Sequence, residues 1–166
     1  LLLEALSREQ DPRVLTAVIT ALEAFPAEPG TIAALKRAAS VPESPYVRGR
    51  ALLALARSRA TDAFEMLKAR LGESSHRDVL RASAFQGFEI LKDPRAVPEI
   101  LGYLRSDRTT RWAREPAVKA LGALAGAGDE ARRLLEEIGR TDFWPGVREA
   151  ARQALRPASD RKEKGS

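Results

Sequence analysis

The sequence predicts an all-α protein, a right-handed α-solenoid of about five helical hairpins. A pattern of apolar residue, usually Arg, two variable residues, small residue, two variable residues, small residue, then Leu or Phe recurs along the 166-residue chain. Its copies begin at Val14, Val47, Leu80, Ala113 and Val147, in steps of 33, 33, 33 and 34 residues. Aromatic residues make up only 5% of the chain, which suits helices in close contact. A period this constant is typical of stacked helical repeats.

Each repeat also carries an earlier apolar trio with helical spacing. Phe64, Leu67 and Leu71 form one such trio, and residues three and four positions apart share one face of a helix. Equivalent trios follow as Val97, Ile100 and Leu104, and as Ala131, Leu134 and Ile138. Each repeat is therefore predicted to be a first helix, a short turn and a second helix that carries the recurring pattern.

Turn and capping residues place the ends of the predicted helices. Asp and Thr cap exposed amides and Pro is tolerated in a first turn, so segments such as Asp93-Pro94 mark helix starts. The predicted first helices are 29–39, 61–71, 94–105 and 128–139. The predicted second helices are 12–25, 44–58, 77–91, 111–125 and 145–156. Pro116 requires the fourth of these either to start late or to be kinked.

These helices group into one predicted repeat domain, residues 1–156. Its units are 1–25, 29–58, 61–91, 94–125 and 128–156. Residues 157–166 are polar and lack an apolar anchor, so we expect a disordered C-terminal tail. The first unit begins in the middle of a repeat without a polar capping helix, and we therefore expect a piece of a longer chain.

Composition narrows the classes of partner. The net charge is +5, and Arg outnumbers Lys by 22 to 6. This bias reflects either the host's base composition or heat adaptation, or else an anion-binding surface, nucleic acid included. The absence of Cys excludes disulfides and Cys-ligated metals. No apolar run approaches the roughly 20 residues of a membrane span, so we expect no membrane partner and a cytoplasmic location.

The repeated Val-Arg-x-x-Ala-x-x-Ala-Leu segment, preceded by an acidic turn, resembles HEAT and HEAT-like repeats. The period is shorter than the roughly 40–47 residues of most HEAT arrays, which points to the compact HEAT-like subclass. Residues 44–52 and 75–84 are also similar to the helical-repeat region of some bacterial zinc aminopeptidases of the gluzincin type. That resemblance implies a C-terminal module that packs on the catalytic domain of its own parent chain. The same resemblance implies that any zinc ion would be bound by the parent protein. We therefore expect no cofactor in this chain.

Four arginines share one repeat position, and stacking would align them in a row: Arg48, Arg81, Arg114 and Arg148. Acidic residues lie shortly before three of them: Glu43, Asp107 and Asp142. In HEAT repeats such acids and arginines pair within or between units, which predicts a structural Asp/Arg ladder. The alternative is that the arginine row binds a peptide carboxylate or phosphate groups, since a guanidinium forms charged hydrogen bonds with either anion.

Residues that differ between units are the candidates for an interaction surface. Aromatic side chains stand just before the pattern at equivalent positions of two repeats, and another lies near the last turn. The predicted surface residues are Tyr46, Arg50, Gln86, Trp112, Lys119 and Trp144.

No catalytic or metal-binding motif is recognisable in the sequence. His76 is the single histidine, so the H-E-x-x-H zinc motif cannot form, and G-x-S-x-G and phosphate-binding loops are absent. We therefore expect a non-enzymatic scaffold whose partner is a protein, most directly other domains of its parent chain. The alternatives are a nucleic-acid-binding protein like the HEAT-like alkylpurine DNA glycosylases, or a free-standing adaptor of the kind related to phycobilin lyases.

Overall fold

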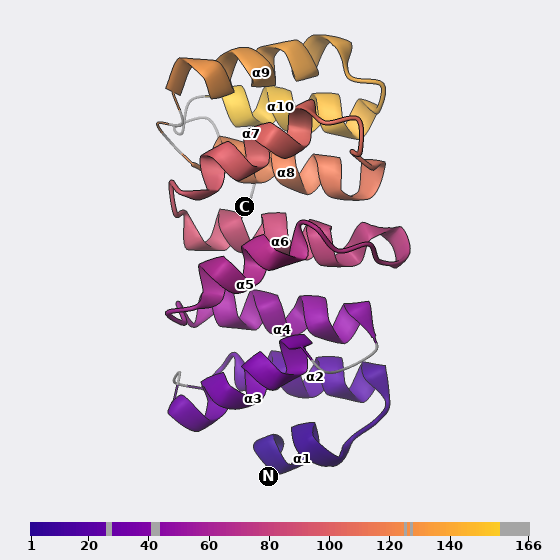
Figure 1. Cartoon of the computed structure of the whole chain (residues 1–166), viewed down its shortest axis with the longest axis vertical. Coiled ribbons are helices and arrows are strands. Elements are labelled where there is room, and N and C mark those ends of the chain that lie inside the picture. Colours follow the sequence, from indigo (N-terminus) through magenta and orange to yellow (C-terminus); the bar gives the residue numbers. More distant parts are fainter. Residues whose placement is uncertain (26–27, 41–43, 125, 127, 157–166) are drawn as a thin grey trace. The chain divides into compact units, whose positions relative to one another are not determined.

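The computed structural model describes residues 1–25, 28–40, 44–124, 126 and 128–156. These residues form ten α-helices, one short 3-10 helix and no strand, which confirms the predicted all-α class (Figure 1). They belong to two compact units, Leu1–Leu91 and Lys92–Ser166. Glu43 and the predicted disordered tail, 157–166, lie outside the described residues.

The first unit contains three helical hairpins. They are α1 (Leu2–Arg8) with α2 (Pro12–Leu22), α3 (Pro29–Ser40) with α4 (Pro45–Arg57), and α5 (Ala63–Arg70) with α6 (Val79–Leu91). A 3-10 helix, η1 (His76–Asp78), precedes α6. Helix α4 packs against both α2 and α6, so the second helices of the hairpins form one layer of this unit (Figure 1).

The second unit contains two hairpins. They are α7 (Ala96–Arg105) with α8 (Arg111–Ala123), and α9 (Gly128–Thr141) with α10 (Pro145–Leu155). Helix α8 packs against α7 and α10, and α9 packs against α10. The second helices are therefore again the ones in contact from hairpin to hairpin.

The recurring sequence pattern marks the positions that pack the helices together. In α4 its apolar and small members, Val47, Ala51, Ala54 and Leu55, are all fully buried. Because alanine side chains are short, neighbouring helices approach closely without leaving voids. The same four positions are buried in α8, and in α10 the first two, Val147 and Ala151, are buried, so the same packing rule applies in both units.

Helix starts follow the predicted capping chemistry at several places. The Asp11 carboxylate accepts a hydrogen bond of 2.7 Å from the Arg13 amide, with Pro12 in the first turn of α2. The Thr110 hydroxyl caps α8 by accepting from the Ala113 amide. Helix α8 then runs through Pro116, so the alternative of a late start at that residue is wrong.

One predicted second helix, 77–91, begins two residues later than expected, at Val79. Arg77 and Asp78 adopt left-handed backbone conformations, with φ of 49° and 56°, which a continuous α-helix cannot contain. The chain makes the tight turn η1 there before α6 starts.

Asp93 caps the turn that leads into α7. One of its carboxylate oxygens accepts from the Arg95 amide at 2.9 Å, and its carboxylate pairs with the Arg95 guanidinium at 2.7 Å. This hydrogen bonding to Arg95 holds the pKa of Asp93 below its ordinary value. A lowered folded-state pKa means that the stabilisation is complete at neutral pH and is lost as the pH falls through that pKa.

Among the helices formed by the described residues, none is long and apolar enough to cross a membrane.

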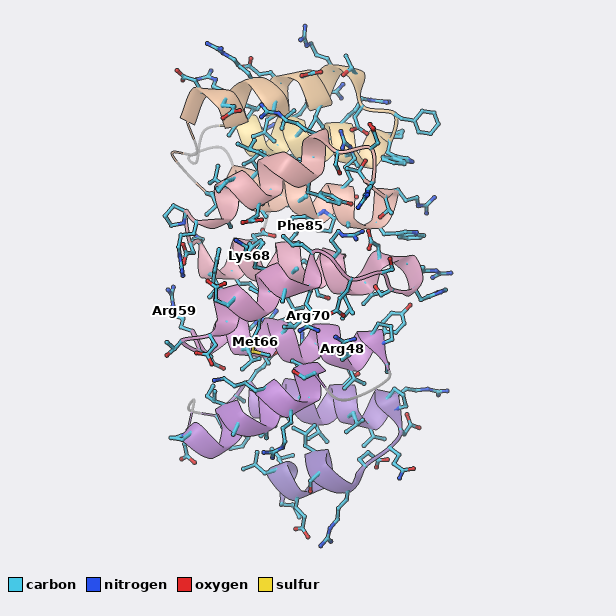
Figure 2. All side chains as sticks on the ribbon, in the orientation of Figure 1. Arg48, Arg59, Met66, Lys68, Arg70 and Phe85 are labelled. Carbon is cyan, nitrogen blue, oxygen red and sulfur yellow. The ribbon has the colours of Figure 1, made fainter. Side chains whose placement is uncertain are left out.

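The end of α4 carries a residue in an unfavourable conformation. Arg59 has a φ of 50°, and the amides of Arg59 and Ala60 donate to the carbonyls of Ala56 and Leu55 at 3.1 Å each. This is the bonding of a Schellman motif, in which Gly is the usual left-handed residue. The Arg59 side chain extends from this turn (Figure 2).

We expect Arg59→Gly to raise the free energy of unfolding of the first unit by about 0.5–1 kcal/mol, because Gly adopts this conformation without a Cβ clash. Thermal unfolding followed by circular dichroism measures the change. The control Ala33→Gly, in the exposed middle of α3, should lower stability by about 1 kcal/mol. An Arg59→Gly protein that melts below the parent chain would contradict the assignment of strain at this turn.

Candidate functional site

The four arginines of the predicted row each bond to the end of the first helix of their own hairpin. The acceptors are backbone carbonyls at or just beyond the last helical turn. The bonds run from Arg48 to Ala39 (3.3 Å), from Arg81 to Leu71 (2.8 Å), from Arg114 to Leu104 (2.9 Å) and from Arg148 to Asp142 (2.6 Å). A cation is favourable there because the helix dipole places partial negative charge on the final carbonyls.

Asp142 joins two members of the row in the second unit. Its Oδ2 accepts from Arg114 Nε at 2.5 Å, and its backbone carbonyl accepts from Arg148. Its Oδ1 also accepts from the Trp144 amide at 3.0 Å, which starts α10. Arg114 and Asp142 belong to consecutive hairpins, and their side chains are only 15% and 3% exposed. This ion pair therefore lies between two repeats in a poorly solvated place.

In the first unit, the acids that pair with the arginine row are not among the acids predicted from the sequence. Arg48 donates to Glu73 at 2.8 Å, and Arg81 donates to Asp78 at 2.7 Å. Arg70 also pairs with Glu73, and Figure 2 labels Arg48 and Arg70, the two side chains that share it. Glu73 and Asp78 could have been found from the sequence, because both precede Arg81 in the turn between the first and second helices.

The predicted acid Asp107 takes a different position. It is exposed in the turn between α7 and α8, whereas Arg114, the arginine that follows it, is paired with Asp142 of the next hairpin. Distance along the chain suggested Asp107 as a partner, but stacking brings the turn of the following repeat closer to Arg114.

Four of the predicted surface residues, Tyr46, Arg50, Gln86 and Lys119, differ in exposure and in hydrogen bonding. Gln86 and Tyr46 are exposed in the first unit. Arg50 bonds within that unit, to Glu23 at 2.8 Å and to Thr20 at 3.0 Å. Lys119 likewise bonds within the second unit, to Glu115 at 2.7 Å. Arg50 and Lys119 thus already have intramolecular partners.

Three aromatic residues of the second unit lie at the starts of its second helices, and we call them the aromatic edge: Trp112, Phe143 and Trp144. Trp112 is 42% exposed, and the Arg111 guanidinium lies 4.1 Å from its ring centroid. Phe143 is 85% exposed and meets Trp144 edge to face at 5.9 Å. The starts of α8 and α10 are close, since a Cβ built on Gly146 would lie 3.2 Å from the Glu115 carboxylate.

A groove of about 1090 Å³ lies between α7 and α9, and we call it the α9 groove. Leu104, Leu134 and Ile138 contribute apolar surface, and Phe143 and Trp144 of the aromatic edge close one end. The remaining lining is charged, with five carboxylates and three guanidinium groups. Among these lining residues, only Trp144, Arg114, Asp107 and Asp142 were predicted from the sequence as site residues. The acids of α9 that line the groove, Asp129, Glu130 and Glu137, belong to no recognisable sequence motif.

The described residues contain no group of three or more His, Cys, Asp or Glu side chains placed to hold a metal ion.

A protein-family model described as HEAT repeats matches residues 1–89 and 79–156. The chain belongs to the HEAT-repeat family. This membership confirms the broader resemblance drawn from the sequence, and it leaves the narrower likeness to zinc aminopeptidases unsupported. None of the curated proteins matches the sequence.

Two solved structures resemble this HEAT-repeat chain. The complex of CpcE and CpcF of phycocyanin lyase from Nostoc sp. PCC7120 is 23% identical, with a TM-score of 0.70, and the match covers 93% of this chain and 62% of that one. Human deoxyhypusine hydroxylase in complex with glycerol is 22% identical, with a TM-score of 0.62 and coverages of 92% and 60%. The HEAT-repeat chain thus spans about three fifths of the length of these proteins. At these identities the likeness shows the fold alone.

The expectation that this HEAT-repeat chain is not an enzyme is contradicted by these similarities. The two similar structures are of a lyase and a hydroxylase, so this fold occurs in enzymes. Motifs such as H-E-x-x-H and G-x-S-x-G are local in sequence, so their absence excludes only those arrangements. Catalytic groups are often assembled from residues distant in the chain, and the absence of those motifs therefore says nothing about such sites.

Proposed function

We propose that the chain is a protein-binding HEAT-repeat module that engages its partner through the aromatic edge of the second unit. Phe143 carries this proposal, because it is a large apolar side chain that is 85% exposed at the end of a groove. Burying a Phe side chain is worth about 1.5–3 kcal/mol. Aromatic residues at the centre of protein interfaces commonly supply most of the binding energy.

The surroundings of Phe143 favour a protein over nucleic acid. Five carboxylates line the adjoining α9 groove and would repel phosphates. Arg111, the cation nearest Trp112, is stacked on that ring. The similar Nostoc structure is a complex of CpcE and CpcF, which also supports protein association by this fold.

The narrower hypothesis concerns which protein is bound. Neither similar structure is described as an aminopeptidase, so docking on a peptidase domain of the same parent chain has no support beyond the sequence resemblance. Cross-linking from the aromatic edge identifies the partner directly, whether it is the parent chain or a separate protein.

A photo-cross-linking residue placed at position 143 tests the proposal in cells of the source organism. We expect one protein to be captured there and not from position 132, since the Arg132 side chain is exposed on α9 and does not line the groove. Capture of the same set of proteins from both positions, or of none from position 143, would overturn the proposal.

The purified partner then provides a quantitative measurement. We expect Phe143→Ala to weaken its binding by about tenfold or more, the loss typical of an interface hot spot. Phe25→Ala is the matched control, because Phe25 is an exposed Phe of the first unit. Retention of full affinity by Phe143→Ala would contradict the assigned interface. Binding of DNA instead, falling steeply above about 50 mM salt, would favour the nucleic-acid alternative.

A further inference from the structure

We propose that the α9 groove receives an extended basic segment of the partner protein, with two cationic side chains four residues apart. This inference rests on the proposed function, because Phe143 and Trp144 of the aromatic edge close one end of the groove. It adds the chemical character of the segment that is bound.

The groove is acidic although the chain as a whole is basic. It contains five carboxylates and three guanidinium groups, against a net charge of +5 for the protein. Two of its arginines are neutralised from within, by the pairs Arg105–Glu130 at 2.6 Å and Arg114–Asp142 at 2.5 Å.

Three carboxylates then remain for a ligand. Asp107, Asp129 and Glu137 make no ion pair with any of the described residues, and all three are exposed. Of the three arginines that line the groove, only Arg133 is left to offset the charge of these carboxylates. Surfaces of opposite charge attract and orient one another during association, so a basic segment complements this lining.

The spacing along α9 defines where the cations of the segment should lie. Asp129, Arg133 and Glu137 occupy successive turns, and a rise of 1.5 Å per residue separates the two acids by about 12 Å. In an extended peptide, residues four apart are separated by about 13 Å. Two Lys or Arg side chains at that spacing match the two acids, and the residue midway faces Arg133 and should not be basic.

The size of the groove also favours a peptide. From Asp129 to Thr141 the helix rises about 18 Å, the length of five or six extended residues. At its end, Phe143 and Trp144 offer ring faces and edges that suit a further cation or an apolar side chain.

Fluorescence anisotropy with labelled synthetic peptides tests the inference on the full chain. The probe is Ala-Arg-Ala-Ser-Ala-Arg-Ala-Ser-Ala, and the comparison peptide carries Glu in place of both Arg. We expect the Arg peptide to bind at low salt and to weaken as salt is added, since the attraction is between exposed charges. The Glu peptide should bind at least about tenfold more weakly, because like charges in an interface are strongly unfavourable.

Two double variants locate the binding. Asp129→Asn with Glu137→Gln should weaken the Arg peptide by about fivefold or more, the loss of two exposed ion pairs. Glu136→Gln with Glu149→Gln removes the same charge from exposed sites outside the groove and should leave binding within about twofold. Both variants should keep the parent melting temperature within a few degrees, since all four acids are exposed.

The outcomes separate this inference from the proposed function. Equal losses in the two double variants, equal binding of the two peptides, or no binding of the Arg peptide would overturn the basic-segment inference. A partner captured at position 143 whose affinity is unaffected by Asp129→Asn with Glu137→Gln would also overturn the basic-segment inference. In that case the proposed function would stand. Failure to capture any partner at position 143 overturns the proposed function itself.

Discussion

Replacing Arg114 with Met is expected to lower the free energy of unfolding of the second unit by about 3 kcal/mol. The Asp142 carboxylate is 3% exposed and would lose the guanidinium that neutralises it, which is the costly way to break a buried pair. The Leu104 carbonyl would lose a donor at the same time. Chemical denaturation followed by tryptophan fluorescence reports on this unit specifically, because Trp112 and Trp144 are the only two tryptophans of the chain.

A matched control and a double-mutant cycle make this result specific. Arg132→Met removes an exposed arginine of α9 and should cost less than about 0.5 kcal/mol. Asp142→Asn on the Arg114→Met background should recover part of the loss, since the uncompensated charge is gone. If Arg114→Met were no more destabilising than Arg132→Met, the stabilising ladder would be rejected. The arginine row would then remain available for binding a carboxylate or phosphate.

Introducing Val at Gly122 is expected to destabilise the second unit by about 3 kcal/mol or to prevent its folding, because the site is already full. A Cβ at Gly122 would lie 2.4 Å from the Ala154 Cβ and 3.0 Å from the Ala154 Cα. Since the second of these is a backbone atom, α10 would have to move away from α8. The same fluorescence-detected denaturation measures the effect.

Gly102→Ala is the natural comparison for this variant. No atom lies within 4 Å of a Cβ built on Gly102, which is exposed in α7, so Ala there should be neutral or stabilising by up to about 1 kcal/mol. Gly122→Ala should destabilise, and adding Ala154→Gly should restore part of the lost stability by making room again. A Gly122→Val protein as stable as the parent chain would show that α8 and α10 do not pack as closely as described.

The helices were predictable from the sequence because their signals are local. The 33-residue period, the apolar trios and the caps placed most helix ends within about two residues, as α3 and α10 show. Departures of two or three residues lie at chain turns. Helix α2 ends at Leu22 rather than residue 25, and the strained pair Arg77 and Asp78 delays α6. Neither departure changes the spacing of apolar residues, so the pattern could not reveal it.

The candidate site was predictable only in part. Trp112 and Trp144 stood out because they differ between repeats, and both lie at the starts of second helices in the second unit. Gly122 carries no local signal of its role, which is the close contact of α8 with Ala154, 32 residues later. That contact depends on how two helices cross, which no local pattern records.

By itself the sequence determined the all-α class, the helical hairpins and the residues that pack them, because helical periodicity and capping act over a few residues. Only the tertiary structure decided which acid meets which arginine, as with Arg48 and Glu73 or Arg114 and Asp142. It also decided that acids of α9 and the exposed Phe143 share one groove. The two ion pairs join residues 25 and 28 positions apart, and the stacking of neighbouring hairpins, rather than distance along the chain, selects these partners.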